Sequence, residues 1–425
     1  MRRSLLILYI LFIVYYVLMM ANGIVIEKGA PIVLGFNILF FAYMVFINVL
    51  RNPFFLKFSI IYLYLLFILM LILNTSTEYY ESLRMFAKYA IAMLAFPAGF
   101  NLIHSKEAYK NLERVVVVFM FLFIVNYILS SIFHLGGANV SYGGDTSIET
   151  GNLFDEALYL NVCTMILTPL LLMSSRRMKL YKLLMVLLCI IISIVCLKRM
   201  VIVCVLLAII TYLVLNFFMN ARYGKLTNRE GKHFHLSLAG KFIIIVSALV
   251  MAVMYSGIFM DQLEARADEL RRRLEDETRV EEMSAIYEDF FNNEDGSVAL
   301  FGKETFNTVG TYANGSFGDR MIHTNFGIML NGTGFIGLSF YILVNFFFLF
   351  IFIKVCHRKL LVAEPAARKM CIAYLSLWLV YNVASFSGTI WLTIYPAFSF
   401  LVQGGIYRFF WDNRFYNGQL KATGV

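Results

Sequence analysis

The sequence predicts an all-α polytopic membrane protein of about twelve transmembrane helices, with one large extracytoplasmic loop between helices 9 and 10. Three observations lead to this fold class. Hydrophobic residues make up 60% of the chain and charged residues only 15%, which leaves too few polar side chains to cover a water-soluble surface. The apolar residues form stretches of roughly 20, the length of a helix that crosses a bilayer core. Lysine and arginine gather in alternate linkers, as expected for linkers that stay in the cytoplasm.

The predicted spans follow from the apolar stretches and the polar breaks between them. Barrel strands would be about half as long. We interpret the first stretch as a retained helix, because no small-residue cleavage site precedes the second one. The predicted spans are 4–22, 31–50, 57–74, 85–103, 114–134, 155–173, 180–197, 200–219, 241–259, 326–353, 370–386 and 389–407.

Charge distribution orients these spans and divides the chain. The net charge of +9 does not indicate a nucleic-acid partner, because the basic residues lie in short groups between apolar stretches. These groups predict that both termini are cytoplasmic. The expected parts are helices 1–9 in 1–259, an extracytoplasmic module in 260–325, helices 10–12 in 326–407 and a cytoplasmic tail in 408–425.

The long loop, 261–325, holds more than half of the acidic residues of the chain. Its first half has the spacing of an amphipathic helix that could lie on a membrane surface. The expected apolar face is Leu263, Ala267, Leu270, Leu274, Met283, Tyr287 and Phe290. The second half is predicted to be irregular structure that can shape a pocket, because of Gly296, Gly302, Gly310, Gly315 and Gly318.

Two pairs of cations stand where positive charge is disfavoured. Lys198 and Arg199 occupy a tight outward turn between the seventh and eighth spans, and Arg84 and Lys88 lie one helical turn apart at the outer end of the fourth. Each pair has two interpretations. Long basic side chains reach the headgroups from such positions, and guanidinium and ammonium groups also bind phosphate.

Three further residues of the loop are candidates for chemistry. Arg279 is spaced to pair with Glu275, so it is either helix surface or an anion ligand. Arg320 and His323 come just before the tenth span, and His323 is either structural or a base beside outward cations. Weaker carboxylate candidates are Asp155, Glu156, Glu304 and Asp319. The six cysteines lack CxxC spacing, so neither a metal site nor a disulfide framework is expected.

These cations share one property: all are expected at the outer membrane face. Convergent cations at the lipid–water boundary suit the diphosphate of a lipid-linked substrate. A free sugar carries no charge for them to hold.

At this point the chain resembles the O-antigen polymerase and O-antigen ligase superfamily, the Wzy and WaaL group of GT-C-type glycosyltransferases. The resemblance covers nearly the whole chain through its topology, including the basic turn in CLKRMVIVCVLLAII and the large loop before the tenth span. The segment HTNFGIMLNGTGFIGL is similar to the family's H-N-x-x-L-x-x-L-x-x-x-G-x-x-G stretch. It departs from that pattern by having Thr324 after the histidine, and by Asn331 where a glycine spaced from Arg320 would stand.

The resemblance implies transfer of a glycan from an undecaprenyl-diphosphate donor at the outer face of the bacterial cytoplasmic membrane, without metal or other cofactor. Carried onto this chain, it implies that Arg199 and Arg279 bind the diphosphate and that His323 assists the attacking hydroxyl. Lys198, Arg84, Lys88 and Arg320 are further candidate ligands. We favour a polymerase of lipid-linked repeat units with a possible chain-length regulator as partner. An O-antigen ligase acting on lipid A core and a polysaccharide flippase are the alternatives, and no half-repeat typical of transporters is found.

Overall fold

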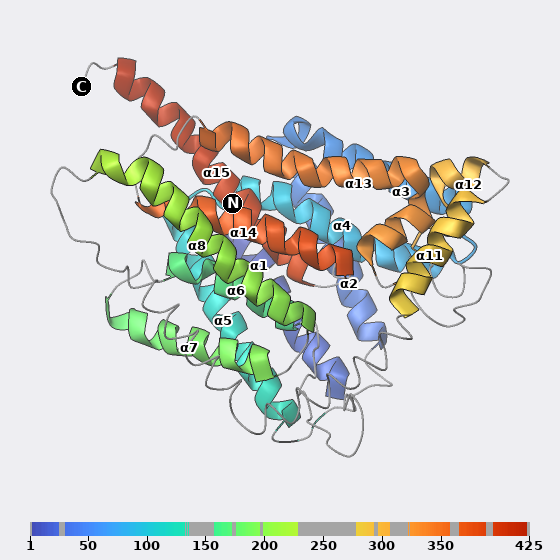
Figure 1. Ribbon diagram of the computed structural model, residues 1–425, viewed down its shortest axis with the longest axis horizontal. Coiled ribbons are helices and arrows are strands. Elements are labelled where there is room, and N and C mark those ends of the chain that lie inside the picture. Colours follow the sequence, from blue (N-terminus) through green and yellow to red (C-terminus); the bar gives the residue numbers. More distant parts are fainter. Residues whose placement is uncertain are drawn as a thin grey trace.

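The computed structural model describes residues 2–24, 30–131, 133, 135, 157–171, 176–195, 199–227, 278–292, 296–306, 322, 324–357, 365–387 and 394–422. In these residues every regular element is a helix (Figure 1). The elements are α1 (Arg2–Ile24), α2 (Ala30–Val45), η1 (Phe46–Leu50), η2 (Phe55–Phe58), α3 (Ser59–Thr75), α4 (Tyr79–Leu102), α5 (Lys106–Ser131), α6 (Ala157–Leu171), α7 (Arg176–Val195), α8 (Arg199–Thr227), α11 (Thr278–Phe291), α12 (Gly296–Phe301), α13 (Asn325–His357), α14 (Pro365–Ser387) and α15 (Ile394–Ala422).

Eight of the described helical segments are long and apolar enough to cross a membrane. They involve α1, α2 with η1, η2 with α3, α4, α5, α8, α13 and α14. The chain is therefore a helical membrane protein. Each predicted span overlaps a described helix except 241–259, which lies outside the described residues. The helix expected to end at 407 continues as α15 through Ala422, so most of the predicted tail 408–425 is helical.

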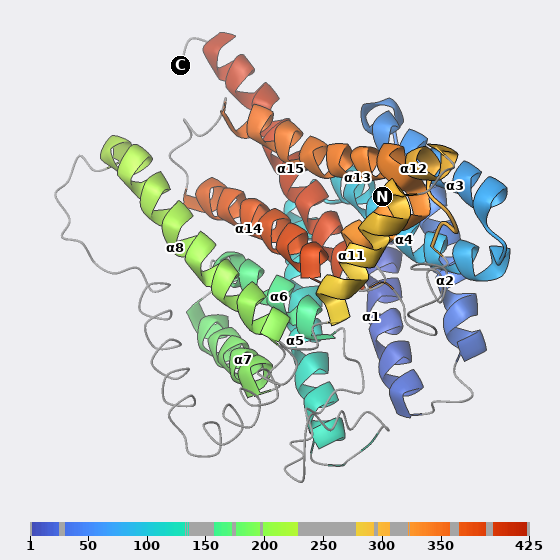
Figure 2. The same cartoon turned by 45° about the vertical axis from the view of Figure 1, so that its right-hand side comes forward.

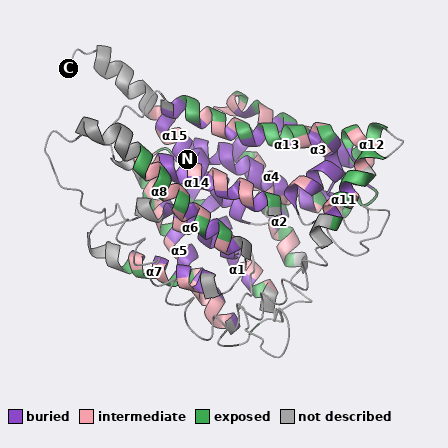
Figure 3. Cartoon of the chain, viewed as in Figure 1, coloured by how far each residue is buried: buried purple, intermediate pink, exposed green. Residues whose placement is uncertain are grey.

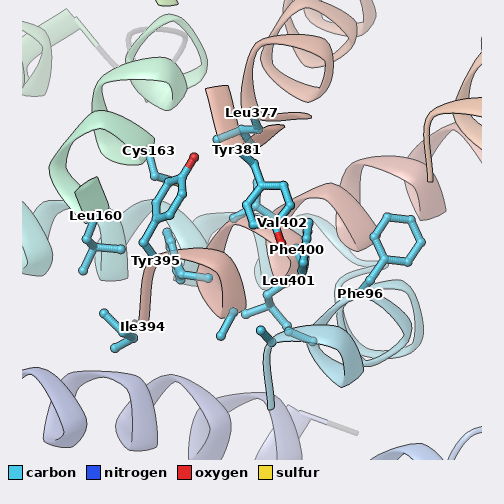
Figure 4. Packing of buried hydrophobic residues seen from close by; sticks show 14 of the residues in the cluster. Phe96, Leu160, Cys163, Leu377, Tyr381, Ile394, Tyr395, Phe400, Leu401 and Val402 are labelled. Atoms are coloured by element: carbon cyan, nitrogen blue, oxygen red, sulfur yellow. The ribbon is translucent and has the colours of Figure 1, made fainter. Parts of the chain in front are cut away.

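The core of the bundle is built around α4 and α15. Within its candidate span, 89% of α4 is buried, whereas the figure for α8 is 17%, so α4 is central and α8 peripheral (Figure 3). Figure 4 shows Phe400 of α15 between Phe96 of α4 and Tyr381 of α14, and the backbone of Leu401 lies against Gly99 of α4. The face of Tyr395 is turned toward Cys163 of α6. Helix α15 thus contacts α4, α6 and α14 and connects these helices in the core.

Small residues let α4 and α15 come into backbone contact. A Cβ added at Gly99 would lie 2.0 Å from the carbonyl oxygen of Leu401, and one added at Gly404 would lie 2.0 Å from that of Phe96. No side chain fits into such a space. Close approach through small residues is the usual basis of tight helix packing in membranes, where lipid tails offer no hydrophobic driving force.

The far end of this helix pair encloses a lysine in aromatic rings. The Nζ of Lys57 lies 3.1 Å from the ring centroid of Trp411, 4.0 Å from that of Phe100 and 4.4 Å from that of Tyr407. Arg408, which is ion-paired with Asp412, lies 4.5 Å above the ring of Phe54. Cation–π contacts of this kind stabilise a desolvated charge.

Helix α13 corrects the prediction of one continuous span over 326–353. Gly334 has φ 61° and ψ −166°, which ends one helix and begins another. Fifteen residues of straight helix would cover about 22 Å, yet the ring centroids of Phe326 and Tyr341 are 5.5 Å apart. The short limb, 325–333, therefore folds back beside the long limb, 335–357, and the bend lies next to α12 in Figures 1 and 2.

Replacing Gly404 by alanine tests the α4–α15 contact. The added Cβ has no space, and overpacking of this kind costs about 1–3 kcal/mol. We expect Gly404→Ala to lower the thermal unfolding midpoint of the detergent-solubilised protein by several degrees. Gly35→Ala on α2 is the matched control, because a Cβ there meets nothing within 4 Å. Equal midpoints for the two variants would contradict the packing described.

Candidate functional site

A short segment after α12 supplies hydrogen-bond donors to the backbone at the break in α13. The N–H of Lys303 donates to the carbonyl oxygen of Asn331 at 2.8 Å, and the hydroxyl of Thr305 donates to that of Gly332 at 2.6 Å. Both acceptors lie in the turn of α13 that the break at Gly334 leaves incomplete. Backbone polar groups in a membrane protein need such internal partners, because lipid supplies none. We call residues 302–306 the bridging segment.

Glycines on both sides bring the bridging segment against α13. A Cβ at Gly302 would lie 2.5 Å from the carbonyl carbon of Gly332 and from the amide nitrogen of Thr333. A Cβ at Gly334 would lie 2.4 Å from the carbonyl carbon of Leu300. Gly302 and Gly334 also have φ values of +78° and +61°, which favour glycine. The glycines of this stretch are therefore required by backbone contact.

Two non-glycine residues of the bridging segment also have left-handed backbone conformations. Glu304 has φ 53° and Phe306 has φ 66°, at a cost on the order of 1 kcal/mol or more each. Contacts with the turn between α3 and α4 and with α4 itself hold them there. The carboxylate of Glu304 accepts the N–H of Thr77 at 3.1 Å, and the ring centroid of Phe306 lies 5.6 Å from that of Tyr89. Glu304, a weaker candidate base, thus has a structural partner.

The short limb of α13 begins immediately after His323. The Oγ1 of Thr324 accepts the N–H of Gly327 at 3.0 Å, so Thr324 is the N-cap of the limb. This gives a structural role to the threonine that departs from the family pattern. Asn325 donates from Nδ2 to the Oγ of Ser385 near the end of α14 at 2.9 Å. The residues on either side of His323, Ile322 and Thr324, are both buried.

Helix α11 packs against this N-terminus and carries Arg279. The Oγ1 of Thr324 lies 3.5 Å from the Sδ of Met283. Arg279 precedes Met283 by four residues in α11, which is about one helical turn. The described backbone therefore brings the helix that carries Arg279 against the segment that follows His323.

Two expectations about this loop need correction. Tyr287, assigned to the apolar face of α11, is exposed, and the buried face is formed by Glu282 and Ile286 with Met283 and Phe290 partly covered. The stretch from Gly296, expected to be irregular, begins with the helical turns of α12. The remaining residues of the expected face, 263–274, and Gly310, Gly315 and Gly318 lie outside the described residues.

Arg199 is the first residue of α8, which packs along α14. Figures 1 and 2 show the N-terminal end of α8 on the same side of the molecule as the C-terminal end of α14, where Ser385 meets Asn325. Arg199, the first residue of α8, and Arg279, the second residue of α11, therefore lie in the first turns of helices at the end of the molecule where α13 begins. Lys198, Arg320 and His323 lie outside the described residues, as do Asp155, Glu156 and Asp319.

The cation pair on α4 is placed differently. Arg84 forms an ion pair with Glu81 one turn earlier, at 2.6 Å, and both side chains are partly exposed. Lys88 is half-buried next to Tyr89, whose ring contacts the bridging segment. The described contacts of Arg84 fit the helix-surface interpretation, because it already has a carboxylate partner.

Glu282 is a candidate that the sequence pattern did not reveal. It is completely buried on α11 and stands beside Met283, which contacts Thr324. A buried carboxylate is rarely tolerated without a cation or hydrogen-bond donors. The sequence feature that could have revealed its burial is its spacing, because Glu282 lies four residues before the buried Ile286. Within a strongly acidic stretch, charge alone could not distinguish it from the exposed Glu281.

The fold and these contacts define a helical membrane protein with two short helices, α11 and α12, attached to a broken membrane helix. Among the described residues, no group of three histidine, cysteine, aspartate or glutamate side chains is arranged to hold a metal ion. Neither a model of a known protein family nor a curated protein matches the chain.

Replacing Gly334 by alanine tests the attachment of the bridging segment. The backbone conformation of Gly334 is essentially confined to glycine and costs another residue on the order of 1–3 kcal/mol, and the Cβ of alanine has no space beside Leu300. We expect Gly334→Ala to speed hydrogen–deuterium exchange at the amide of Lys303 at least tenfold, with α1 unchanged. Gly296→Ala is the control, because a Cβ there meets nothing within 4 Å. Unaltered exchange in Gly334→Ala would show that the break does not depend on this contact.

Proposed function

We propose that this chain is a membrane glycosyltransferase that polymerises undecaprenyl-diphosphate-linked oligosaccharide repeat units for O-antigen, capsule or exopolysaccharide. It would lie in the bacterial cytoplasmic membrane with twelve spans, both termini in the cytoplasm and the 260–325 module outside. The donor would bind at the outer face, and no metal or other cofactor would take part. A chain-length regulator is a possible protein partner.

The observation that carries this proposal is the contact between Thr324 and Met283. Through it, the segment that follows His323 meets the helix that begins next to Arg279. Arg199 starts a further helix at the same end of the molecule. A base and two guanidinium groups brought together at this end would suit glycosyl transfer from a lipid diphosphate.

In the proposed reaction, a hydroxyl oxygen of the acceptor attacks the anomeric carbon of the donor sugar. The bond between that carbon and the diphosphate oxygen breaks, and its electron pair stays on the diphosphate. Arg199 and Arg279, with Lys198 and Arg320 as further ligands, would offset this charge through hydrogen bonds. His323 would take the proton from the attacking hydroxyl, since an imidazole has a pKa near neutrality. Arg84 and Lys88 would lie at the edge of the site.

Replacing the proposed ligands and base tests this function. In a strain that lacks the gene, we expect Arg199→Ala, Arg279→Ala and His323→Ala each to reduce long glycan chains by roughly 100-fold at matched membrane levels, as loss of one transition-state contact commonly does. Single repeat units would remain, either on the core or on undecaprenyl diphosphate. The measurement is size-resolved analysis of surface glycan and lipid-linked intermediates.

Arg114→Ala is the matched control, because Arg114 is an exposed cation on α5 paired only locally with Asn111 among its described contacts. Long polymer accumulating on undecaprenyl diphosphate would indicate a ligase instead. Loss of every outward-facing repeat unit would indicate a transporter. Full activity in all three variants would reject the assigned site.

The role of Glu282 gives a separate prediction. Glu282→Gln keeps the shape of the side chain but replaces its buried carboxyl group by an amide. This change is destabilising because it leaves the partner of that carboxyl group without its matching group. We expect long-chain polymer to fall about tenfold or more, since a loss of about 1.36 kcal/mol of stabilisation lowers a rate or an equilibrium constant by a factor of ten. Glu281→Gln, its exposed neighbour, should retain normal polymer. Equal polymer in both variants would remove Glu282 from the site.

A further inference from the structure

Four large apolar side chains are exposed at the tip formed by α11 and α12. The exposed fractions are 47% for Tyr287, 75% for Phe291, 46% for Leu300 and 39% for Phe301. These helices contact each other, and Figure 3 shows exposed residues on both. We call these four residues the apolar edge. Soluble surfaces rarely gather such residues without an interaction partner.

The position of the apolar edge around α11 separates it from both the buried and the acidic faces. Glu282 and Ile286 face the rest of the protein. At 100° per residue, Tyr287 and Phe291 lie about 100–180° further round the helix, and the exposed Glu281 and Glu288 follow beyond them. The rings of Tyr287 and Phe291 stack with centroids 6.4 Å apart. One helix therefore presents a protein-facing side, an aromatic side and an acidic side.

The apolar edge continues a surface that already faces lipid. The backbone of Leu300 lies against Gly334, and the next residue of α13, Phe335, is 61% exposed. From there, exposed apolar residues at helical spacing run along α13, namely Phe335, Leu343, Phe346, Phe350 and Ile353. Because α13 is long and apolar enough to cross a membrane, this stripe is the lipid-contacting face of the helix. Leu300 and Phe301 extend it beyond the end of the long limb.

We propose that α11 and α12 lie in the boundary between lipid headgroups and acyl chains, with the apolar edge immersed and Glu281 and Glu288 in water. The occupant of this surface is the bilayer. An amphipathic helix that lies in the plane of the interface buries its apolar side by about 5–10 Å, and aromatic residues are enriched at that depth. This inference does not depend on the proposed enzymatic activity.

The arrangement has a mechanical consequence for the candidate site. Helix α11 is held on one side by Met283 against Thr324 and on another by lipid contact of Tyr287 and Phe291. Two supports of different chemistry set the height of α11, the helix whose backbone includes Arg279, relative to the membrane surface. The charged group of a ligand at the lipid–water boundary would lie at the same depth as this helix.

Nitroxide labels on introduced cysteines test the proposal in the full-length protein, reconstituted in phosphatidylethanolamine–phosphatidylglycerol vesicles. Phe291→Cys, Leu300→Cys and Phe301→Cys are labelled one at a time. Their relaxation is measured with oxygen, which concentrates in lipid, and with a nickel chelate, which stays in water. The unsubstituted chain gives the background, and its described cysteines, Cys163, Cys189, Cys204, Cys356 and Cys371, are all buried.

Two control positions calibrate the result. Glu288→Cys lies next to Tyr287 on the acidic side and should favour nickel, whereas Phe350→Cys on the stripe of α13 should favour oxygen. We expect the oxygen-to-nickel ratio at the three test positions to exceed that at 288 by at least fivefold. All three native side chains are exposed, so labelling leaves the packed core intact.

Two outcomes would overturn the proposal. Nickel access at 291, 300 and 301 equal to that at 288 would mean that the apolar edge is in water. Poor access of both reagents would mean that protein covers it, either a second copy of this chain or another partner. As a second measurement, quenching of Phe291→Trp by brominated lipid above the level of the native tryptophans supports lipid contact, and no added quenching contradicts it.

Discussion

The arrangement at one end of this molecule follows from a constraint on membrane helices: a broken helix must find new partners for its backbone groups. Helix α13 breaks at Gly334, and the bridging segment supplies those partners through Lys303 and Thr305. Because glycines on both sides remove every intervening Cβ, the contact is between backbones. The position of α12, the fold-back of 325–333 and the docking of α11 all depend on this closure.

The closure also determines where the candidate chemistry lies. Without the fold-back, the segment after His323 would continue the axis of α13 and stand away from α14. With it, Thr324 contacts α11 and Asn325 contacts Ser385. A site built in this way relies on backbone geometry several residues from any proposed ligand. Its glycines matter through packing. Its strained residues are held by contacts elsewhere, Glu304 by the turn between α3 and α4 and Phe306 by α4.

Cations near the membrane have more than one physical explanation in this chain. Arg84 has a carboxylate partner on its own helix, and Lys57 is enclosed by aromatic rings. Neither needs a phosphate. Arg199 and Arg279, by contrast, lie in the first turns of α8 and α11 at the end where α13 starts. Basic residues of similar sequence context thus differ in their surroundings, and among those in described helices only Arg199 and Arg279 remain the principal ligands of the proposed diphosphate site.

The sequence by itself determined the membrane class and the approximate course of the helices, because the apolar length needed to cross a bilayer is a local property of the chain. It also identified His323, Arg199 and Arg279 as candidate site residues, since basic residues at the ends of apolar stretches can be recognised in the sequence. Tertiary structure alone decided the fold-back at Gly334, the burial of Glu282 and the exposure of Tyr287. These three features depend on which backbone segments contact one another. Such contacts join residues that are separated along the chain by spacings that no periodic pattern predicts.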